Sequence, residues 1–457
     1  MAGVIDKQRG GALERLFDLT GAATTVRIEV LAGVTTFLTM AYIVFVQPAV
    51  LSTDFAGHPT GLDPGAILLA TCVGSAFASI LMGVWANYPI ALAPGMGENF
   101  FFVSVIMSVA ALGIPNAWQT ALGVVFVAGV IFWLISAFGI REAILNVISP
   151  SMRNGIAVGI GVFITFIGLR NAGVLAASPS TFITLNRQLL SPDMAVFFAG
   201  LLTAAGLQAR RVRGAILWGM LVAAVTAFAF GKIHYEGLIG LPHVGQAALF
   251  KMDIARALSL SLLPFIAVLL VMDVFDTVGT LIGVAEQAGF TKNNTLPRAN
   301  RVLMVDATGT VAGACLGTST VTAFIESAAG VAAGGRTGLT AIVTGLLFLL
   351  TLLFSPLVIS IGRYLPITAP ALVIVGAMMM QNVAKIDWDD HSEGIPAFLT
   401  IVGIPLFYSI ADGLALGFVC YPIVKLLGGR ARDVRWLTYA MAALLVLYFL
   451  FVRSRLG

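Results

Sequence analysis

Long apolar runs recur along almost the whole chain and constrain its fold more than any single motif. Examples are residues 66–84, 122–138, 216–230 and 339–357. Many runs reach about 17–20 residues, the length of helix that crosses a hydrocarbon core. Only 11% of the residues are charged and 59% are hydrophobic, whereas soluble domains carry about 25% charged residues. We therefore predict one all-α polytopic membrane domain embedded in the lipid bilayer.

Fourteen membrane spans are predicted, at 29–51, 66–86, 89–112, 118–140, 153–170, 194–208, 214–231, 260–285, 299–316, 319–334, 337–359, 367–384, 396–409 and 411–428. The apolar stretch 436–452 fits either a further span or an interfacial helix. A polar leader precedes the first span, and that span is too long for the apolar region of a signal peptide, so we expect no cleavable signal.

Basic residues predict the orientation, because Lys and Arg are enriched in cytoplasmic loops. If the N-terminus lies inside, the even-numbered loops are cytoplasmic, and the short odd loops after spans 1, 3, 9 and 13 contain neither Lys nor Arg. The cytoplasmic set then includes Arg141, Arg210, Arg211, Arg213, Lys292, Arg298, Arg301, Arg336, Lys385, Lys425, Arg430, Arg432 and Arg435. We expect a multi-pass protein of the cell (inner or plasma) membrane, and no nucleic-acid partner.

Two predicted spans contain helix-breaking sequences. ALAPGMGENFFF (91–102) includes Pro94 and Gly95, which disfavour a helix interior. In LGTSTVTAFIES (316–327), Gly317 leads a run of β-branched and hydroxyl residues that favours extended chain. Each is the third span in a set of seven, and a set of seven must be followed by an inverted set. Paired interruptions of this kind point to the binding site of a transporter.

This symmetry predicts the organisation of the chain. We expect a cytoplasmic N-terminal segment (1–28), a first seven-span repeat (29–231), an extracytoplasmic connection (232–259), a second, inverted seven-span repeat (260–428) and a basic C-terminal segment (429–457) that contains the undecided apolar stretch.

Acidic residues lie inside apolar spans. In VMDVFDTVGTLIGV (271–284), Asp273 and Asp276 are three residues apart and should share one helix face. Two nearby carboxylates in a low dielectric cannot both ionise cheaply, so one is expected to hold a proton. Such a group suits a proton-coupled carrier, and it can accept hydrogen bonds from N–H groups of a substrate.

Further polar residues in the spans are Glu98, Asn99, Asp306 and Glu326. Structural roles remain open for several of them: Asp306 follows Arg301 and could neutralise it, and Glu98 could face away from Asn99. No Lys or Arg lies deep in the predicted spans, which argues against an anion site. The three cysteines have no metal-like spacing, so neither a disulfide nor a metal site is expected.

Four stretches resemble the nucleobase–cation symporter-2 family, and within it the AzgA-type purine permeases for hypoxanthine, guanine and adenine. They are APGMGEN (93–99), DVFDTVGTLIGVAEQAGF (273–290), GTSTVTAFIESAAGVAAGGRTGLTA (317–341) and YSIADGLALGF (408–418). The resemblance implies a UraA-like seven-plus-seven inverted repeat, short β-strands in spans 3 and 10, and a core domain that moves against a gate domain. It also implies a homodimer and symport of a purine nucleobase with a proton, without another cofactor.

The same resemblance implies roles for individual residues. Asp273 and Asp276 match the acids of span 8, Glu326 the acid of span 10, Asn99 the amide of span 3, and Asp306 a supporting acid in span 9. The expected substrate-binding residues are Glu326, Asp276, Asp273, Asn99, Thr318, Ser319, Thr320 and Phe324. The expected proton-coupling residues are Asp276, Glu326 and Asp306. Phe324 or Phe100 could stack on the purine. Family members often have other residues at the positions of Glu98, Phe100 and Phe101, which leaves the choice among purines open.

Three other functional classes remain as alternatives. An anion transporter of the same architecture would be expected to hold a cation at its site. An ion channel could be lined by the acids, but paired interrupted spans fit alternating access better. A membrane enzyme is disfavoured: DTVGT (276–280) loosely resembles an aspartyl-phosphate motif, yet no cytoplasmic loop is long enough for a catalytic domain.

Overall fold

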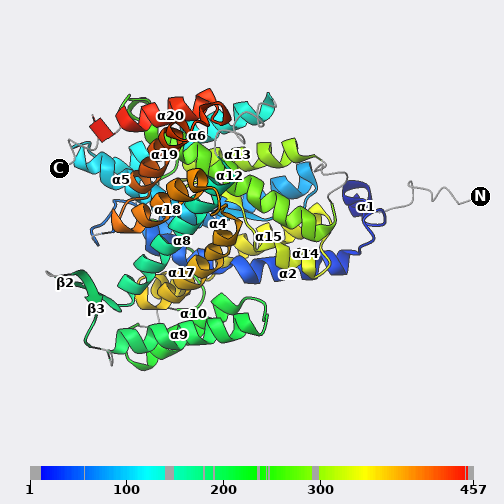
Figure 1. Cartoon of the computed structure of the whole chain (residues 1–457). Coiled ribbons are helices and arrows are strands. Elements are labelled where there is room, and N and C mark those ends of the chain that lie inside the picture. Colours follow the sequence, from blue (N-terminus) through cyan, green and yellow to red (C-terminus); the bar gives the residue numbers. More distant parts are fainter. Residues whose placement is uncertain are drawn as a thin grey trace, which may run out of the picture.

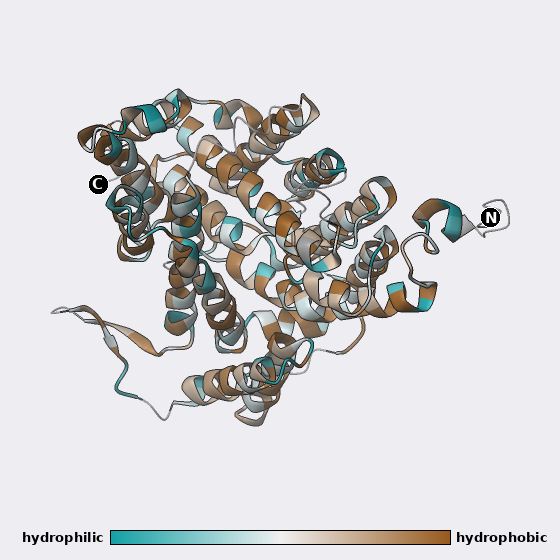
Figure 2. Cartoon of the chain, turned by 45° about the vertical axis from the view of Figure 1, so that its right-hand side comes forward, coloured by the Kyte–Doolittle hydropathy of each residue, from teal (hydrophilic) through white to brown (hydrophobic). Residues whose placement is uncertain are grey.

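Helices dominate the computed structural model, which describes residues 12–55, 57–138, 149–178, 181–188, 191–233, 237–242, 244, 248–290, 298–447 and 449–450. Among these residues, 8 helical segments are long and apolar enough to cross a membrane. Four more apolar helices are shorter. Brown, hydrophobic residues predominate along the helices in Figure 2. The chain is therefore a mostly helical polytopic membrane protein.

The helices follow the order of the predicted spans. They are α1 (Ala12–Phe17), α2 (Val26–Met40), α3 (Tyr42–Leu51), α4 (Pro64–Leu81), α5 (Met96–Ala111), α6 (Ala117–Ala137), α8 (Pro150–Asn171), α9 (Pro192–Ala209), α10 (Ala215–Ala229), α11 (Ile254–Ala257), α12 (Leu263–Ala288), α13 (Ala299–Leu316), α14 (Ser327–Ala332), α15 (Gly338–Thr351), α16 (Ser355–Gly362), α17 (Leu365–Met379), α18 (His391–Leu406), α19 (Ile410–Leu427) and α20 (Trp436–Leu447). The strands are β1 (Leu92–Pro94), β2 (Leu175–Ser178), β3 (Phe182–Leu185) and β4 (Val321–Ala323).

Three of the long helices begin with the same local signal. Asp63, Ser149 and Ser191 each precede a proline and accept a hydrogen bond from a backbone N–H in the first turn of α4, α8 and α9. A short polar side chain at the N-cap satisfies an otherwise free N–H, and proline fits the first helical position because it has no N–H to satisfy. The sequence around these three positions thus sets where each helix starts.

The helices pack in two groups. The first helix group contains α2, α4, α6, α12, α13, α14 and α15. The second helix group contains α8, α9, α10, α17, α18 and α19, and Figure 1 shows α9 and α10 side by side below α17. Helices α3 and α5 contact members of both groups. The two interrupted spans pack among these helices. β4 and α14 pack on α12, and α5 contacts both α6 and α8.

The two interrupted spans meet through their strands. β1 and β4 pair antiparallel, with Ala93 opposite Thr322. Ser79 of α4 holds β1 from the side: its hydroxyl accepts from the N–H of Leu92 at 2.9 Å and donates to its carbonyl at 3.1 Å. Gly317 ends α13 in a left-handed conformation (φ 99°), and a Cβ at this position would lie 2.2 Å from the Cβ of Ala248. The short strands expected in spans 3 and 10 are present.

The structure adds one hairpin to the predicted fold and leaves several predictions untested. The β2–β3 hairpin between α8 and α9 was not predicted. α20 packs against α19 and covers part of the undecided stretch, whereas residues 448, 451 and 452 lie outside the described residues. Residues 1–11, Arg141 and Lys292 also lie outside them. The fourteen spans and the inverted repeat remain predictions.

Candidate functional site

The two aspartates of α12 lie in different environments. Asp273 is buried, and its Oδ2 accepts a hydrogen bond from the Thr310 hydroxyl at 2.9 Å, while its Oδ1 has no hydrogen-bond partner among the described residues. Asp276, one turn further, is exposed. The two acids therefore differ in exposure, because α13 packs over Asp273 and leaves Asp276 open.

An exposed stripe extends from Asp276 along α12. It consists of Asp276, Gly279 and Ile282 on α12, together with Ile325 from the segment before α14. A Cβ added at Gly279 would meet no atom within 4 Å, which shows that the space beside it is open. The exposed stripe runs from Asp276 toward the C-terminal end of α12, which is the predicted cytoplasmic end.

Glu326 lies across from this stripe and is oriented by α3. The Tyr42 hydroxyl donates to Glu326 Oε1 at 2.8 Å, and the Thr39 hydroxyl donates to the Glu326 carbonyl at 3.4 Å. Glu326 is half-buried. The residue before it, Ile325, lies beside α12, because a Cβ added at Gly283 would be 3.1 Å from Ile325 Cδ1. Tyr42 was missed by the sequence analysis, although it is a hydroxyl group inside an apolar span.

A second polar cluster forms beside the β1–β4 pair. Gln47 of α3 donates from Nε2 to Asn99 Oδ1 at 2.9 Å, to Thr318 Oγ1 at 2.9 Å and to Ser319 Oγ at 3.3 Å. Asn99 also donates to Gln47, and Ser319 to Asn99. All four side chains are fully buried. The structure therefore brings Asn99, Thr318 and Ser319 together, but their polar atoms bond to one another and to Gln47, which was not predicted.

Asp306 has a supporting position. Its Oδ2 accepts from the Thr277 hydroxyl at 2.6 Å, and its Oδ1 accepts from the N–H of Ala323 at 2.8 Å. The Thr277 hydroxyl also lies 2.9 Å from that of Thr322. Asp306 is fully buried, so it ties α12 and α13 to β4. Thr320, another predicted site residue, is buried with a hydroxyl that has no partner in the described part of the chain.

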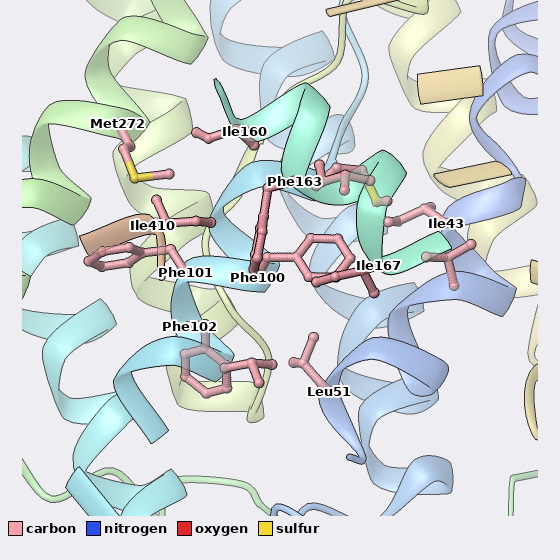
Figure 3. Close-up of a cluster of buried hydrophobic side chains, with 14 of the residues drawn as sticks. Ile43, Leu51, Phe100, Phe101, Phe102, Ile160, Phe163, Ile167, Met272 and Ile410 are labelled. Atoms are coloured by element: carbon pink, nitrogen blue, oxygen red, sulfur yellow. The ribbon is translucent and has the colours of Figure 1, made fainter. Parts of the chain in front are cut away.

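The aromatic candidates for stacking on a substrate are covered by other side chains. Phe324 is 5% exposed and Phe100 1%. Figure 3 shows Phe100 and its two neighbours among apolar side chains of other helices, including Phe163 and Ile167. The Phe100 ring stacks on Phe55 and meets Phe163 edge-on, with ring centroids 6.2 Å apart in both pairs. Neither ring offers a free face in this conformation.

Aromatic rings and one arginine connect the loop after α3 to the second helix group. Arg170, at the end of α8, donates to the Phe55 carbonyl and, at 2.5 Å, to the Tyr408 hydroxyl. The Tyr408 ring lies 5.5 Å from the rings of both Phe55 and Phe163, measured between centroids. We call Phe55, Phe163, Arg170 and Tyr408 the outer closure. It connects the loop after α3 to α8 and to the α18–α19 turn.

One arginine lies beside α12. α8 begins at Pro150, so Arg153 is inside its first turn, and its guanidinium carbon lies 5.0 Å from the centroid of the Phe275 ring. Arg153 forms no ion pair with an acid among the described residues, and the prediction that no Lys or Arg lies deep in the spans stays a prediction. Its Nε is buried without a hydrogen-bond partner among the described atoms.

The site carboxyls are Glu98, Asp273, Asp276, Asp306 and Glu326. Within the described part of the chain, none of them forms an ion pair with a Lys, Arg or His side chain. The same part of the chain contains no group of three or more His, Cys, Asp or Glu side chains arranged to hold a metal ion. Uncompensated carboxylates are costly in a low dielectric. The arrangement offers carboxyl oxygens that can accept hydrogen bonds from a ligand.

Comparisons of sequence identify close relatives. The model of a family described as "Permease family" matches residues 27–416. The guanine/hypoxanthine permease PbuG of Bacillus subtilis is 43% identical over 450 residues, which cover 96% of this chain and 100% of that protein. The adenine permease AdeQ of Escherichia coli is 42% identical over 443 residues, with 97% of each chain covered.

Comparison of structures finds a similar fold in a distant protein. The transmembrane domain of a cyanobacterium bicarbonate transporter, BicA, superposes with a TM-score of 0.61 at 17% sequence identity. The match covers 86% of this chain and 97% of that domain. At this identity the similarity concerns the fold alone, and it places the helical arrangement among those of membrane transporters.

Proposed function

The chain belongs to the permease family of nucleobase–cation symporters-2, and from this premise we propose that it imports purine nucleobases with protons. The relatives are permeases, so the chain is a transporter and not an enzyme. Relatives named for guanine, hypoxanthine and adenine support a purine substrate. The observation that carries the proposal is that Glu326 follows three residues after β4 while Asp276 lies on α12, which packs on β4, and that neither carboxyl forms an ion pair among the described residues.

Both carboxyls can reach a substrate. Glu326 uses Oε1 for Tyr42, which leaves Oε2 for an N–H group of the purine. Asp276 is exposed and can take a second N–H group. α5 starts after Gly95 without a side-chain cap, so its first backbone N–H groups can serve the ring-nitrogen acceptors of the base. Asp273, Asn99, Thr318, Ser319, Thr320 and Phe324 would then shape the wall behind these contacts.

We assign the transported proton to the carboxyl groups of Asp276 and Glu326. A carboxyl in a low dielectric is more easily neutral than charged, and Asp276 and Glu326 both have exposed surface through which a proton can arrive. Asp306 accepts two hydrogen bonds and holds β4 in register beside them. Binding of a proton and a neutral base together would allow the loaded site to move without a net buried negative charge.

Alternating access is the mechanism that the two helix groups support. The first helix group would act as the core, the second as the gate, in a fourteen-span, seven-plus-seven fold that assembles as a homodimer. In such a cycle the outer closure would block the outside, and the exposed stripe would face the cytoplasm. The conformation would then be inward-open, with the N-terminus in the cytoplasm of the cell.

An anion carrier is the second candidate, because Arg153 lies beside Phe275 and because the fold is similar to that of a bicarbonate transporter. The site carboxyls weigh against it, since an anion would meet like charges without a paired cation. The two candidates predict different substrates and opposite effects of acid neutralisation, so one set of assays separates them.

The test is uptake of radiolabelled hypoxanthine, guanine, adenine and uracil by cells that lack their own permeases, with and without a protonophore. Glu326→Gln and Asp276→Asn are compared with Asp389→Asn, which changes an exposed carboxylate far from the site. We expect saturable purine uptake that collapses with the protonophore and in both site variants but not in Asp389→Asn. A well-expressed wild type that takes up none of the four bases would refute the purine assignment.

A further inference from the structure

The turn between α9 and α10 carries three arginines to which the proposed mechanism gives no role. Arg210 follows the last residue of α9, Arg211 and Arg213 come next, and all three are exposed. Among the described residues, none of the three forms an ion pair. The sequence contains no Asp or Glu from residue 194 to residue 231. The turn is therefore a concentrated positive charge at the predicted cytoplasmic end of both helices.

Arg211 stands at a backbone position that helices usually give to glycine. Its φ is 57°, in the left-handed region that side chains rarely adopt. Its N–H donates to the Gln208 carbonyl at 2.9 Å, and the Val212 N–H donates to the Leu207 carbonyl at 2.9 Å. These two bonds form the helix ending in which glycine is the common left-handed residue. The enrichment of arginine in cytoplasmic loops does not select this strained position, and retained strain of this kind marks a candidate functional residue.

The turn packs on α2, a helix of the first helix group. Gly214 has a φ of 69°, and a Cβ at this position would lie 3.0 Å from the carbonyl oxygen of Leu38. Beside it, Arg213 Nη1 donates to the Thr35 hydroxyl at 3.3 Å, and Thr35 is 5% exposed. The turn thus connects the second helix group to the first, and Arg213 is already held against α2.

Exposed apolar side chains lie on the helices that meet at this turn. They are Leu38 on α2, Leu202 on α9 and Trp218 on α10, and Val212 is exposed in the turn itself. Figure 1 shows α9 and α10 at the lower edge of the molecule, where they are open to the bilayer. Tryptophan is enriched where a membrane protein meets the membrane–water interface. Positive charge beside apolar surface is complementary to a lipid with an anionic headgroup, and a soluble anion would leave the apolar surface unused.

We propose that the α9–α10 turn binds the phosphate of an anionic phospholipid through Arg210 and Arg211, and that the bound lipid holds the turn against α2. A guanidinium group binds phosphate through two parallel hydrogen bonds. Arg213 already donates to Thr35, so the other two arginines are the main ligands. Each arginine near an anionic membrane surface contributes about fivefold in affinity. The inference depends on the membrane embedding of the chain and not on its substrate.

The experiment measures the unfolding temperature of the purified protein in a neutral detergent during titration with phosphatidylglycerol or phosphatidylcholine. We expect phosphatidylglycerol to stabilise the wild type and phosphatidylcholine to have little effect. In Arg210→Gln/Arg211→Gln, the phosphatidylglycerol concentration for half of the effect should rise roughly 25-fold. In Arg211→Gly it should rise about fivefold. Without lipid, Arg211→Gly should unfold no earlier than the wild type, because glycine adopts the left-handed conformation without strain.

The matched control is Arg432→Gln/Arg435→Gln, which removes two exposed arginines from the segment after α19, where Asp433 lies between them. Its response to phosphatidylglycerol should equal that of the wild type. In a second arm, inorganic phosphate replaces the lipid and should not stabilise the wild type at the same concentrations.

Three results would each overturn the inference: equal responses of the wild type and Arg210→Gln/Arg211→Gln, an equal loss of response in the control, or the full effect from phosphate alone. If the double variant cannot be purified, Arg211→Gly decides, because an unchanged response there contradicts the same claim. None of these results bears on the purine assignment, which uptake tests separately.

Discussion

The hydroxyl of Tyr42 donates a 2.8 Å hydrogen bond to Oε1 of Glu326, and this bond connects the first predicted span to the tenth. Tyr42 is 1% exposed, so it has little freedom to turn away. The bond holds one oxygen of the carboxyl group and leaves Oε2 as the oxygen that would face the proposed substrate. The position of the proposed ligand oxygen therefore depends on a residue from the other half of the chain.

Tyr42→Phe should raise the KM for purine uptake about tenfold, because a hydrogen bond to a carboxylate is worth roughly 1.5–3 kcal/mol. The maximal rate per transporter should change less than the KM, since the carboxyl itself remains. Saturation kinetics in cells measure both. Tyr439→Phe serves as the control, because that hydroxyl bonds the Ala431 carbonyl near α20. An unchanged KM in Tyr42→Phe would contradict the orienting role.

Gln47→Leu should destabilise the protein, because Gln47 donates hydrogen bonds to three buried side chains. A buried polar group left without its partner costs about 1–3 kcal/mol. Thermal unfolding of the purified protein in detergent should therefore begin at a lower temperature, and uptake should fall. Gln381→Leu, at an exposed position, should leave both unchanged. Equal unfolding temperatures for Gln47→Leu and wild type would show that the cluster is not structural.

Arg170→Gln should weaken the outer closure, because the guanidinium is the group that joins the Phe55 carbonyl to the Tyr408 hydroxyl. In a background without Cys72, Cys315 and Cys420, a Ser104→Cys reporter in α5 should react several-fold faster with a maleimide that cannot cross the membrane, added outside. Ser104 itself is 6% exposed.

Arg187→Gln, which changes an exposed arginine, should leave the labelling rate unchanged. Purine uptake by Arg170→Gln is measured in the same cells to show that the protein is assembled. Slow labelling of the reporter in Arg170→Gln, equal to that in the parent, would mean that the outer closure does not hold the two helix groups together.

Asp390 lies outside the predicted spans and provides a control for the pH dependence of uptake. Hydrogen bonds from Ser392, with Lys425 and Arg430 nearby, lower the pKa of Asp390 to about 2. A lowered pKa in the folded protein stabilises it above the ordinary pKa of the acid, and that contribution is lost as the pH falls toward about 2. Asp390 is therefore ionised throughout the range in which uptake is measured.

Asp390→Asn should accordingly lower the unfolding temperature by a similar amount at every pH from mildly acidic to mildly alkaline, and it should leave the shape of the pH profile of uptake unchanged. Unfolding and uptake measured over the same pH series provide the comparison. A displaced uptake profile in Asp390→Asn would mean that the pH dependence does not arise at the site carboxyls.

Much of the fold could be predicted because a bilayer sets the length of a crossing helix. The prediction 299–316 coincides with α13 (Ala299–Leu316), and 194–208 lies within α9 (Pro192–Ala209). The interruptions were also visible, since Pro94 and Gly317 are poor helix residues. The strands β1 and β4 were expected only from the family resemblance, and their pairing was not predicted, because no local pattern specifies a partner strand in the other half of the chain.

The site was predicted less completely than the fold. Asp276 and Glu326 were identified because charge is rare in apolar spans, whereas Tyr42 and Gln47 were missed because an uncharged polar residue in a span has no distinctive pattern. The different exposure of Asp273 and Asp276 depends on how α13 covers α12, which their spacing cannot show. Phe100 was a stacking candidate by proximity to Asn99, but its ring packs into the outer half of the core.

The central claim is that one protein couples a purine to a proton, and purified protein in liposomes tests it most directly. The measurement is accumulation of a radiolabelled purine inside liposomes whose interior is alkaline relative to the outside, with wild type and Glu326→Gln compared. We predict that wild type concentrates the purine above the external level, that a protonophore abolishes this accumulation, and that Glu326→Gln only approaches equilibrium or does not transport. Wild-type uptake that reaches the same level with and without the proton gradient would contradict the account.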